Sequence, residues 1–230
     1  PYQDIANKGN DPVEGNTTRV LESDLKAVSD FLNTNFGYET GIYQGYDLNT
    51  TGDKYLAKLD WNINDKNKFS LRFNRLDSEA DQLISNSTSL GFGNRRTNGR
   101  AMSYRNSNYI IFDKITSVIG ELNTLFSNKL SNNFIAGWTF QNEDRGTYGT
   151  FFPLIEIQQE GQTYISTGFE PFTPNNQLEY TTYQLQDNLS LYLNKHTLTA
   201  GLNIERLKFR NVFFPGAQGV FVYNSLEDFY

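Results

Sequence analysis

The most informative stretch of the sequence is DKYLAKLDWNINDKNKFSLRFNRL, residues 53–76. Side chains of a β-strand point alternately to its two faces. Apolar side chains recur here at every second position, namely Tyr55, Ala57, Leu59, Trp61, Ile63, Phe69, Leu71 and Phe73. Polar side chains fill the positions between them, Leu56 being the exception, and the polar segment 64–67 suits a hairpin turn. We therefore predict an antiparallel hairpin with one apolar face and one polar face.

The same pattern occurs twice more, at residues 117–142 and 180–209. The three hairpins give six strands within residues 53–210, joined by two loops of 40 and 37 residues at 77–116 and 143–179. Short turns thus lie at one end of the strands and long loops at the other. A compact soluble domain rarely carries several such loops, whereas outer-membrane barrels combine short periplasmic turns with long extracellular loops.

The composition agrees with strands that lie between lipid and water. No run approaches the roughly 18 apolar residues of a membrane-spanning helix, so any membrane role belongs to strands. Aromatic residues make up 15% of the chain although its hydrophobic content is only 37%. The net charge of −6 argues against a nucleic-acid partner, and the lack of cysteine excludes disulfides and thiol chemistry. We predict an all-β, antiparallel, up-and-down transmembrane barrel segment. A soluble sheet with a one-sided core produces the same alternation and remains the alternative.

The segments outside the hairpins carry weaker signals. Residues 1–52 predict an extracellular loop with a short helix at about 24–35, capped by Ser23 and followed by Gly37, rather than a separate domain. Residues 104–112 are either an additional strand or the rising end of the next one. EIQQEGQTYIST indicates a small hairpin around Glu160 and Gly161. Residues 211–230 predict a loop and the start of a further strand at 220–223.

Three stretches resemble the barrel of TonB-dependent outer-membrane receptors, of the Oar-like and SusC-like type with a carboxypeptidase-regulatory-like extension. They are KLDWNINDKNKFSLRFN, IGELNTLFSNKLSNNFIAGWT and QDNLSLYLNKHTLTAGLNIE, and GVFVYNSLEDF is similar to a loop-to-strand junction of that family. The resemblance covers nearly the whole chain. It implies a barrel of about 22 strands with an N-terminal plug and a segment that contacts TonB. It also implies energy-driven import of a bulky nutrient across the bacterial outer membrane.

The sequence departs from that family because six strands cannot close a barrel, the smallest of which have about eight. An open sheet would expose unpaired edges to lipid, which is not tolerated. We therefore interpret the chain as a wall segment of a larger barrel, and its ends at Pro1 and Tyr230 as internal to a longer protein. The expected partners are outer-membrane lipid, the protein's own plug and remaining strands, the TonB complex and a surface lipoprotein. A non-transporting barrel for adhesion or assembly, and a soluble carbohydrate- or protein-binding domain, are the alternative functions.

The alternation assigns candidate residues to the two faces. Lipid-facing or girdle residues are Tyr55, Trp61, Phe69, Phe73, Phe134, Trp138 and Phe140. Lumen-lining residues are Asp60, Arg72, Glu121, Asn123, Gln141, Asn188 and Glu205, which serve either substrate passage or a hydrated structural lining. Asp187 falls on the lipid face, where a charge costs about 1 to 3 kcal/mol at depth. We expect it to have a bulge, an inter-strand partner or a position near the rim.

The loops offer a second set of candidates, Arg95, Arg96, Arg100, Tyr148, Phe151 and Phe152. The arginines suit an anionic ligand or lipopolysaccharide phosphates, and the aromatic side chains suit stacking on sugars or apolar peptide groups. Packing of the loops on one another explains the same residues. The single histidine, His196, has no second nitrogen ligand, and a calcium loop from Asp47 fails because its twelfth position is Lys58. The sequence predicts no metal site, no cofactor and no enzymatic activity.

Overall fold

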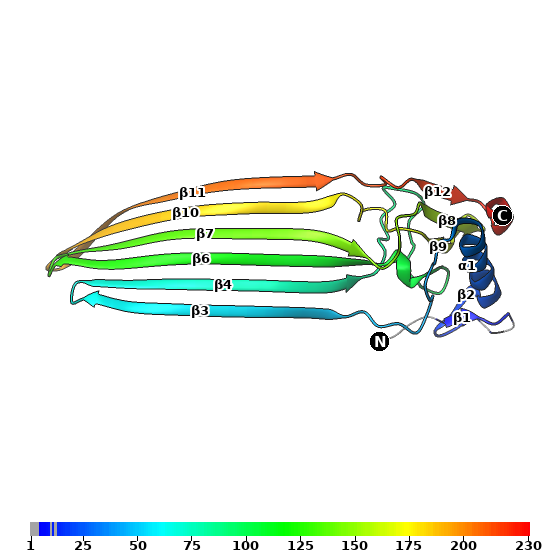
Figure 1. Cartoon of the computed structure of the whole chain (residues 1–230), viewed down its shortest axis with the longest axis horizontal. Helices are drawn as coiled ribbons and strands as arrows, with labels where there is room; N and C mark the ends of the chain where they lie inside the picture. Colours follow the sequence, from blue (N-terminus) through cyan, green and yellow to red (C-terminus); the bar gives the residue numbers. More distant parts are fainter. Residues whose placement is uncertain (1–4, 10, 12) are drawn as a thin grey trace.

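The computed structural model describes residues 5–9, 11 and 13–230. Within this part of the chain, six long strands form one antiparallel sheet that extends from a smaller unit at one end (Figure 1). The strands are β3 (Thr50–Asn64), β4 (Asn67–Gln82), β6 (Tyr109–Ser127), β7 (Leu130–Thr147), β10 (Asn176–Leu193) and β11 (His196–Phe213). They stand in the order β11-β10-β7-β6-β4-β3, so that each follows its neighbour in the chain. The predicted up-and-down antiparallel sheet is confirmed.

The strands are longer than the sequence pattern predicts. They contain 15 to 19 residues, whereas a spanning strand needs about 9 to 11. The hairpins consequently cover 50–82, 109–147 and 176–213, and the segment 104–112 supplies the rising end of β6. The added ends of β4 (77–82) and β7 (143–147) escaped the pattern because both of their faces carry polar side chains. The added end of β6 begins with YIIF at 109–112, where consecutive apolar residues hide the alternation that reveals a strand.

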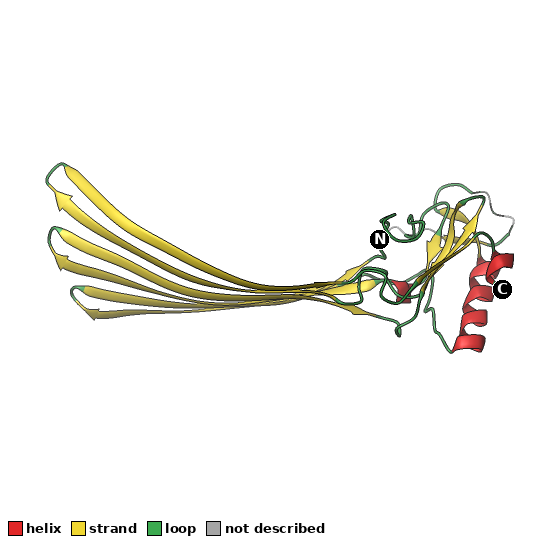
Figure 2. Ribbon diagram, turned by 90° about the horizontal axis from the view of Figure 1, so that it is seen from above, coloured by secondary structure: helices red, strands yellow, loops and turns green. Residues whose placement is uncertain are grey.

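The sheet is curved and open. Figure 2 shows the strands fanning into a curved surface toward the three short turns. In the described part of the chain, β3 and β11 each pair on one side only. The backbone N–H and C=O groups along the other side of each edge strand therefore point away from the sheet with no strand to receive them.

The long connections differ from the separate loops that the sequence predicts, because they meet in one folded unit (Figures 1 and 2). We call it the loop domain. It contains β1 (Ile5–Asn7), β2 (Thr17–Leu21), α1 (Glu22–Phe36), β5 (Met102–Ser103), the 3-10 turn η1 (Arg105–Ser107), β8 (Leu154–Gln159), β9 (Gln162–Thr167), β12 (Val220–Tyr223) and α2 (Leu226–Phe229). Its four-stranded sheet has the order β12-β8-β9-β5, which unites strands from three connections. The predicted hairpin around Glu160 is confirmed as β8 and β9, and the predicted strand at 220–223 as β12.

A hydrophobic core of its own holds the loop domain together. Helix α1 buries Leu25, Val28 and Leu32 against apolar side chains of the small sheet, among them Ile157 and Ile165. The helix begins at Glu22 after Leu21, which makes no side-chain capping bond, so the predicted cap at Ser23 is wrong. Its end at Gly37 is as predicted, since this glycine takes the left-handed conformation (φ 65°) that ends many helices. None of the helices in residues 5–9, 11 and 13–230 is both long and apolar enough to cross a membrane.

Two buried tyrosines tie α1 to this core. The Tyr104 hydroxyl donates to the Leu25 carbonyl oxygen at 2.6 Å, and the Tyr164 hydroxyl donates to Asp24 Oδ2 at 2.8 Å. Burial raises the pKa of both phenols, that of Tyr104 well above its ordinary value. An unfolded tyrosine has a pKa of about 10. The unfolded chain therefore loses these protons at lower pH than the folded loop domain does.

We predict that the loop domain loses stability as pH rises above about 10. At that pH the unfolded chain begins to release its tyrosine protons, whereas the buried phenols of the folded state, whose pKa values are raised, still hold theirs. The free energy of unfolding therefore falls with further increase in pH. A pH titration followed by tyrosinate absorbance and by amide hydrogen exchange of α1 checks this. The Tyr104→Phe variant removes one titrating group and should show a shallower decline in stability above that pH. Titration of these tyrosines near pH 10 without loss of exchange protection would contradict the prediction.

Candidate functional site

The strand register brings the predicted polar-face residues into rows across the sheet, because paired residues share a face. One row runs Asp60–Ser70–Glu121, and the next toward the turns runs Asn62–Lys68–Asn123–Asn133–Asn188. In both rows every pairing joins adjacent strands, so residues distant in the sequence become neighbours. The polar face is thus a continuous surface over at least five strands.

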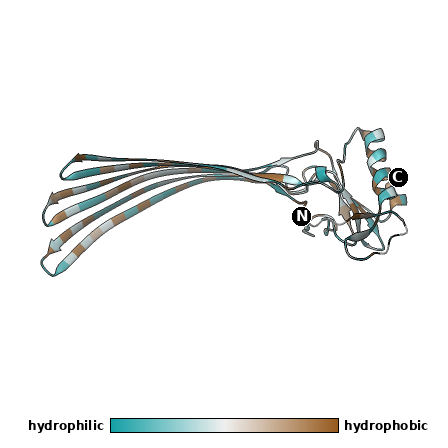
Figure 3. Cartoon of the chain, turned by 90° about the horizontal axis from the view of Figure 1, so that it is seen from below, coloured by the Kyte–Doolittle hydropathy of each residue, from teal (hydrophilic) through white to brown (hydrophobic). Residues whose placement is uncertain are grey.

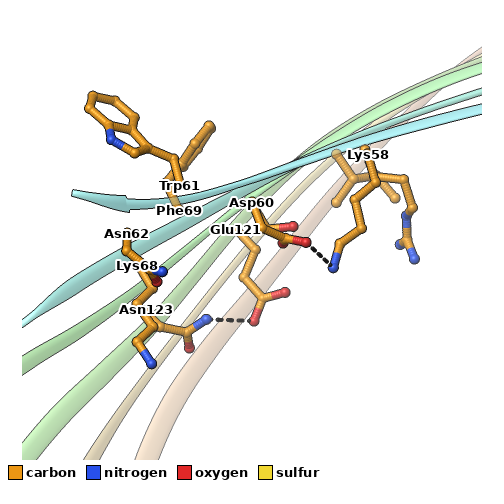
Figure 4. A pocket seen from close by; sticks show the side chains of 11 residues that line it. Lys58, Asp60, Trp61, Asn62, Lys68, Phe69, Glu121 and Asn123 are labelled. Carbon is orange, nitrogen blue, oxygen red and sulfur yellow. Dashed lines mark hydrogen bonds and ion pairs between the residues drawn. The ribbon is translucent and has the colours of Figure 1, made fainter. Parts of the chain in front are cut away.

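A hollow of about 490 Å³ lies on this face over β3, β4 and β6. It brings together four of the predicted residues, Asp60, Arg72, Glu121 and Asn123, with Lys58 and Lys68. Figure 4 shows Lys58, Asp60, Glu121 and Asn123 on one side of the sheet and the rings of Trp61 and Phe69 on the other. Both signs of charge line the hollow, which gives it hydrogen-bond donors and acceptors for a polar guest.

Hydrogen bonds fix the acidic side chains of the hollow. Lys58 Nζ lies 2.9 Å from Asp60 Oδ2 (Figure 4). Glu121 Oε1 accepts from Asn123 Nδ2 at 3.0 Å and from Asn133 Nδ2 at 2.7 Å. The lysines and Asn133 were not singled out from the sequence, although alternation already puts them on the polar face. Only the strand register reveals that these side chains lie beside the predicted residues.

The other three predicted polar-face residues lie outside this hollow. Asn188 lines a second hollow nearer the turns, together with Asn123 and Asn133. Gln141 lies farther along β7, where its Oε1 accepts from the Tyr180 hydroxyl at 2.5 Å. Glu205 stands on the edge strand β11, opposite Gln184. No group of three or more His, Asp or Glu side chains in the described residues is placed to hold a metal ion.

The opposite face carries the predicted aromatic and aliphatic residues in parallel rows. Trp61, Phe69, Leu122 and Phe134 form one row, and Ala57, Phe73, Val118 and Trp138 form another. Tyr55 and Phe140 occupy the next row, and Trp138 and Phe140 stack at 6.4 Å. Figure 3 shows hydrophobic and hydrophilic residues alternating along the strands toward the turns. Trp61 and Tyr55 are each 57% exposed, so no second layer formed by the described residues covers them.

A family model described as an outer membrane beta barrel domain matches residues 1–229. The chain belongs to this outer-membrane β-barrel family. Its place is therefore the bacterial outer membrane, and the uncovered apolar face meets lipid, as it does in such barrels. No curated protein matches the chain. The match to the outer-membrane family excludes the alternative interpretation of a soluble sheet with a one-sided core.

Asp187 is the one acidic residue of the apolar rows in this barrel segment, and it has a partner. It stands in the row of Phe134 and Leu202, and the pairing around it contains no bulge. Its Oδ1 accepts from Asn132 Nδ2 on the neighbouring strand β7 at 2.6 Å. The predicted inter-strand partner is therefore confirmed, and this hydrogen bond offsets part of the cost of a carboxylate that faces lipid.

The loop arginines of the barrel segment do not gather into one site. Arg95 is completely buried, with its Nε 2.6 Å from Glu156 Oε1 and its terminal nitrogens on the carbonyl oxygens of Ser85, Ser87 and Leu90. Glu156, also completely buried, accepts from the N–H groups of Phe92 and Gly93. The pair thus holds residues 85–95 in a compact turn, and Arg95 has no surface with which to contact a ligand.

The remaining loop candidates are dispersed. Arg96 Nε donates to the Ile84 carbonyl oxygen, and an Arg100 terminal nitrogen donates to Gln162 Oε1. Tyr148 lies beneath the Arg105 guanidinium, 4.6 Å from its ring centre, and Phe152 stacks on Tyr38 at 4.2 Å. Phe151 remains 64% exposed. The ordinary explanation, packing of the loops on each other, accounts for Arg95 and Phe152, while ligand contact by the exposed residues stays a prediction.

The apolar face gives a sharp test of the lipid contact. Leu185 stands in a central row with Leu71 and Ile204, whereas Gln186 is its neighbour on the polar face. We predict that Leu185→Arg destabilises the folded barrel by about 2–4 kcal/mol, since an arginine at mid-depth loses its hydration. Gln186→Arg, with the same new side chain, should cost far less. Reversible unfolding in lipid vesicles measures both, and equal costs would contradict the assignment of the faces.

The buried ion pair gives a second test. We predict that Glu156→Gln destabilises the loop domain by about 3–5 kcal/mol, because it leaves the Arg95 guanidinium buried without a counter-charge. Glu160→Gln is the matched control, since Glu160 is exposed and pairs with Arg19 at 3.4 Å, a contact expected to contribute less than about 1 kcal/mol. Hydrogen exchange of residues 85–95 measures the difference. Equal protection in the two variants would show that the buried pair is not what holds the turn.

Proposed function

We propose that the chain forms a wall segment of a TonB-dependent outer-membrane receptor that imports a bulky nutrient. The observation that carries the proposal is the open sheet, since β3 and β11 each lack a partner on one side within the described residues. Lipid does not tolerate such edges, so further strands must complete the barrel. The resemblance of three stretches to TonB-dependent receptors supports a large, plugged barrel as the complete form.

The polar face supplies the inner wall of this receptor. Lys58, Asp60, Arg72 and Glu121 give it charges of both signs, and the asparagine row gives it neutral donors and acceptors. Such a lining keeps a polar ligand or a plug segment hydrated and binds no single charge type strongly. The loop domain stands above the wall on the side of the long connections, which is the extracellular side of such barrels. We assign ligand capture to this domain.

A non-transporting role in adhesion is the second candidate. It is favoured by the separate core of the loop domain and by its exposed rings, such as Phe36 at 62% and Phe151 at 64% exposure. An adhesion domain needs a stable binding surface and no passage through the barrel. The two functions therefore differ in whether the ligand accumulates inside the cell and whether accumulation needs inner-membrane energy.

Uptake of fluorescent peptide and glycan libraries by cells that produce the native protein tests the proposal. We predict energy-dependent accumulation that falls at least about tenfold when TonB is deleted. Ser70→Trp, which fills the hollow of the inner wall, should slow uptake several-fold. Leu71→Trp faces lipid and serves as the control, with uptake close to that of the parent protein. Surface binding without accumulation would refute transport and favour adhesion. Accumulation that persists without TonB would refute the assignment to TonB-dependent receptors.

A further inference from the structure

The outward face of β11 changes its chemistry at one level. Toward the turn it carries Leu198, Ala200, Leu202 and Ile204, and beyond them the same face carries Arg206, Lys208 and Arg210. The pairing of β10 with β11 runs without a register shift from Asn176 to Leu193, so the alternation of faces is unbroken. The three cations therefore point to the same side as the lipid-facing leucines.

The neighbouring residues place these cations at the edge of the hydrocarbon. Arg206 pairs with Tyr183, and Tyr183 pairs in turn with Trp138. Lys208 Nζ lies 5.6 Å from the centre of the Tyr183 ring. Aromatic girdles mark the two boundaries of the apolar band in outer-membrane barrels. This girdle lies toward the long connections, so Arg206, Lys208 and Arg210 stand at the outer leaflet.

The positive charge at this level is concentrated on β11. All three side chains are exposed, and none forms an ion pair with another described residue. Glu179 is the carboxylate opposite Arg210, whereas Thr181 and Tyr183 stand opposite the other two. Elsewhere at this height the outward face carries Asp53, Asp77 and Glu79 on β3 and β4, with Arg75 paired to Asp77 at 2.7 Å. Lys114 on β6 also faces outward and stands opposite Asp77. On β11, by contrast, three cations follow one another on the outward face.

We propose that Arg206, Lys208 and Arg210 bind the phosphate groups of lipid A, the phosphorylated glycolipid of the outer leaflet. Guanidinium groups match phosphate oxygens in a bidentate geometry, and an ammonium group adds a point charge. The acyl chains of the same lipid lie along Leu202 and Ile204 just below. One lipid molecule thus meets a cationic and an apolar surface on a single strand. This inference goes beyond the proposed function and does not depend on transport.

Lipid retention by the native protein purified from outer membranes tests the proposal. A cation near an anionic lipid surface contributes about 1 kcal/mol, or roughly fivefold in affinity. We expect the triple variant Arg206→Gln, Lys208→Gln, Arg210→Gln to bind bis-phosphorylated lipid A about 100-fold more weakly by native mass spectrometry. The charge-preserving variant Arg206→Lys, Lys208→Arg, Arg210→Lys keeps three cations but only one bidentate guanidinium group, so it should lose far less affinity than the glutamine variant. Retarded migration of the unheated barrel on detergent gels verifies that each variant is folded.

The control removes three lysines from the short turns at the opposite end of the strands, by Lys66→Gln, Lys129→Gln and Lys195→Gln. These exposed side chains carry the same total charge but lie at the inner leaflet, so lipid A binding should be unchanged. Dephosphorylated lipid A should bind weakly to every variant. Equal losses in the turn variant, undiminished binding of the dephosphorylated lipid, or a preference for phosphatidylglycerol over lipid A would overturn the proposal.

Discussion

The backbone of the sheet must have its hydrogen-bonding groups satisfied wherever lipid surrounds it. Water is absent there, and each unpaired N–H or C=O costs several kcal/mol. Four of the long strands meet this requirement on both sides within the described residues, while β3 and β11 meet it on one side only. Within the described residues the sheet is therefore open, and its two edges need further strands wherever lipid surrounds them.

The chemistry of the two faces is exchanged along the length of β11. Near the turns the outward side chains of β11 are aliphatic and the inward ones polar, whereas beyond Glu205 the outward ones are cationic and the inward ones include Leu207 and Phe209. This exchange happens without a bulge, because the backbone hydrogen bonds do not depend on which face carries the apolar side chains. It marks the level at which the outside of the wall passes from hydrocarbon to headgroups and water. The strands then continue beyond the bilayer and support the loop domain.

The loop domain changes how the extracellular side of the molecule should be viewed. Segments that look like flexible connections share one small sheet, one helix and one core, with Leu25, Ile157 and Ile165 at its centre. The Arg95–Glu156 pair holds one of these segments through charge-assisted bonds in a site without water. A prefolded module of this kind loses less conformational entropy on binding a ligand than mobile loops would.

The sequence alone determined the membrane-level part of the fold. Alternation of Leu59, Trp61 and Phe73 with charged residues marks the two faces, since a strand's side chains repeat every two residues, and polar turns mark where each hairpin reverses. It also marked Asp187 as a charge on the lipid face, and the structure chose the inter-strand partner from the three expected alternatives. The sequence predicted the candidate residues of the hollow only in part. Alternation gave the face on which they lie, whereas their proximity to one another depended on the register of three strands.

Only the tertiary structure showed that the long connections fold into one loop domain and that Arg95 is buried in it. The pairings β5–β9 and β8–β12 join short segments that are far apart in the chain, and segments of two to six residues carry too little periodicity to reveal a partner. Arg95 resembles its exposed neighbours Arg96 and Arg100 in sequence and differs from them because Glu156, 61 positions away, enters the core beside it. Local sequence determines which face a side chain takes, whereas burial depends on contacts between distant segments.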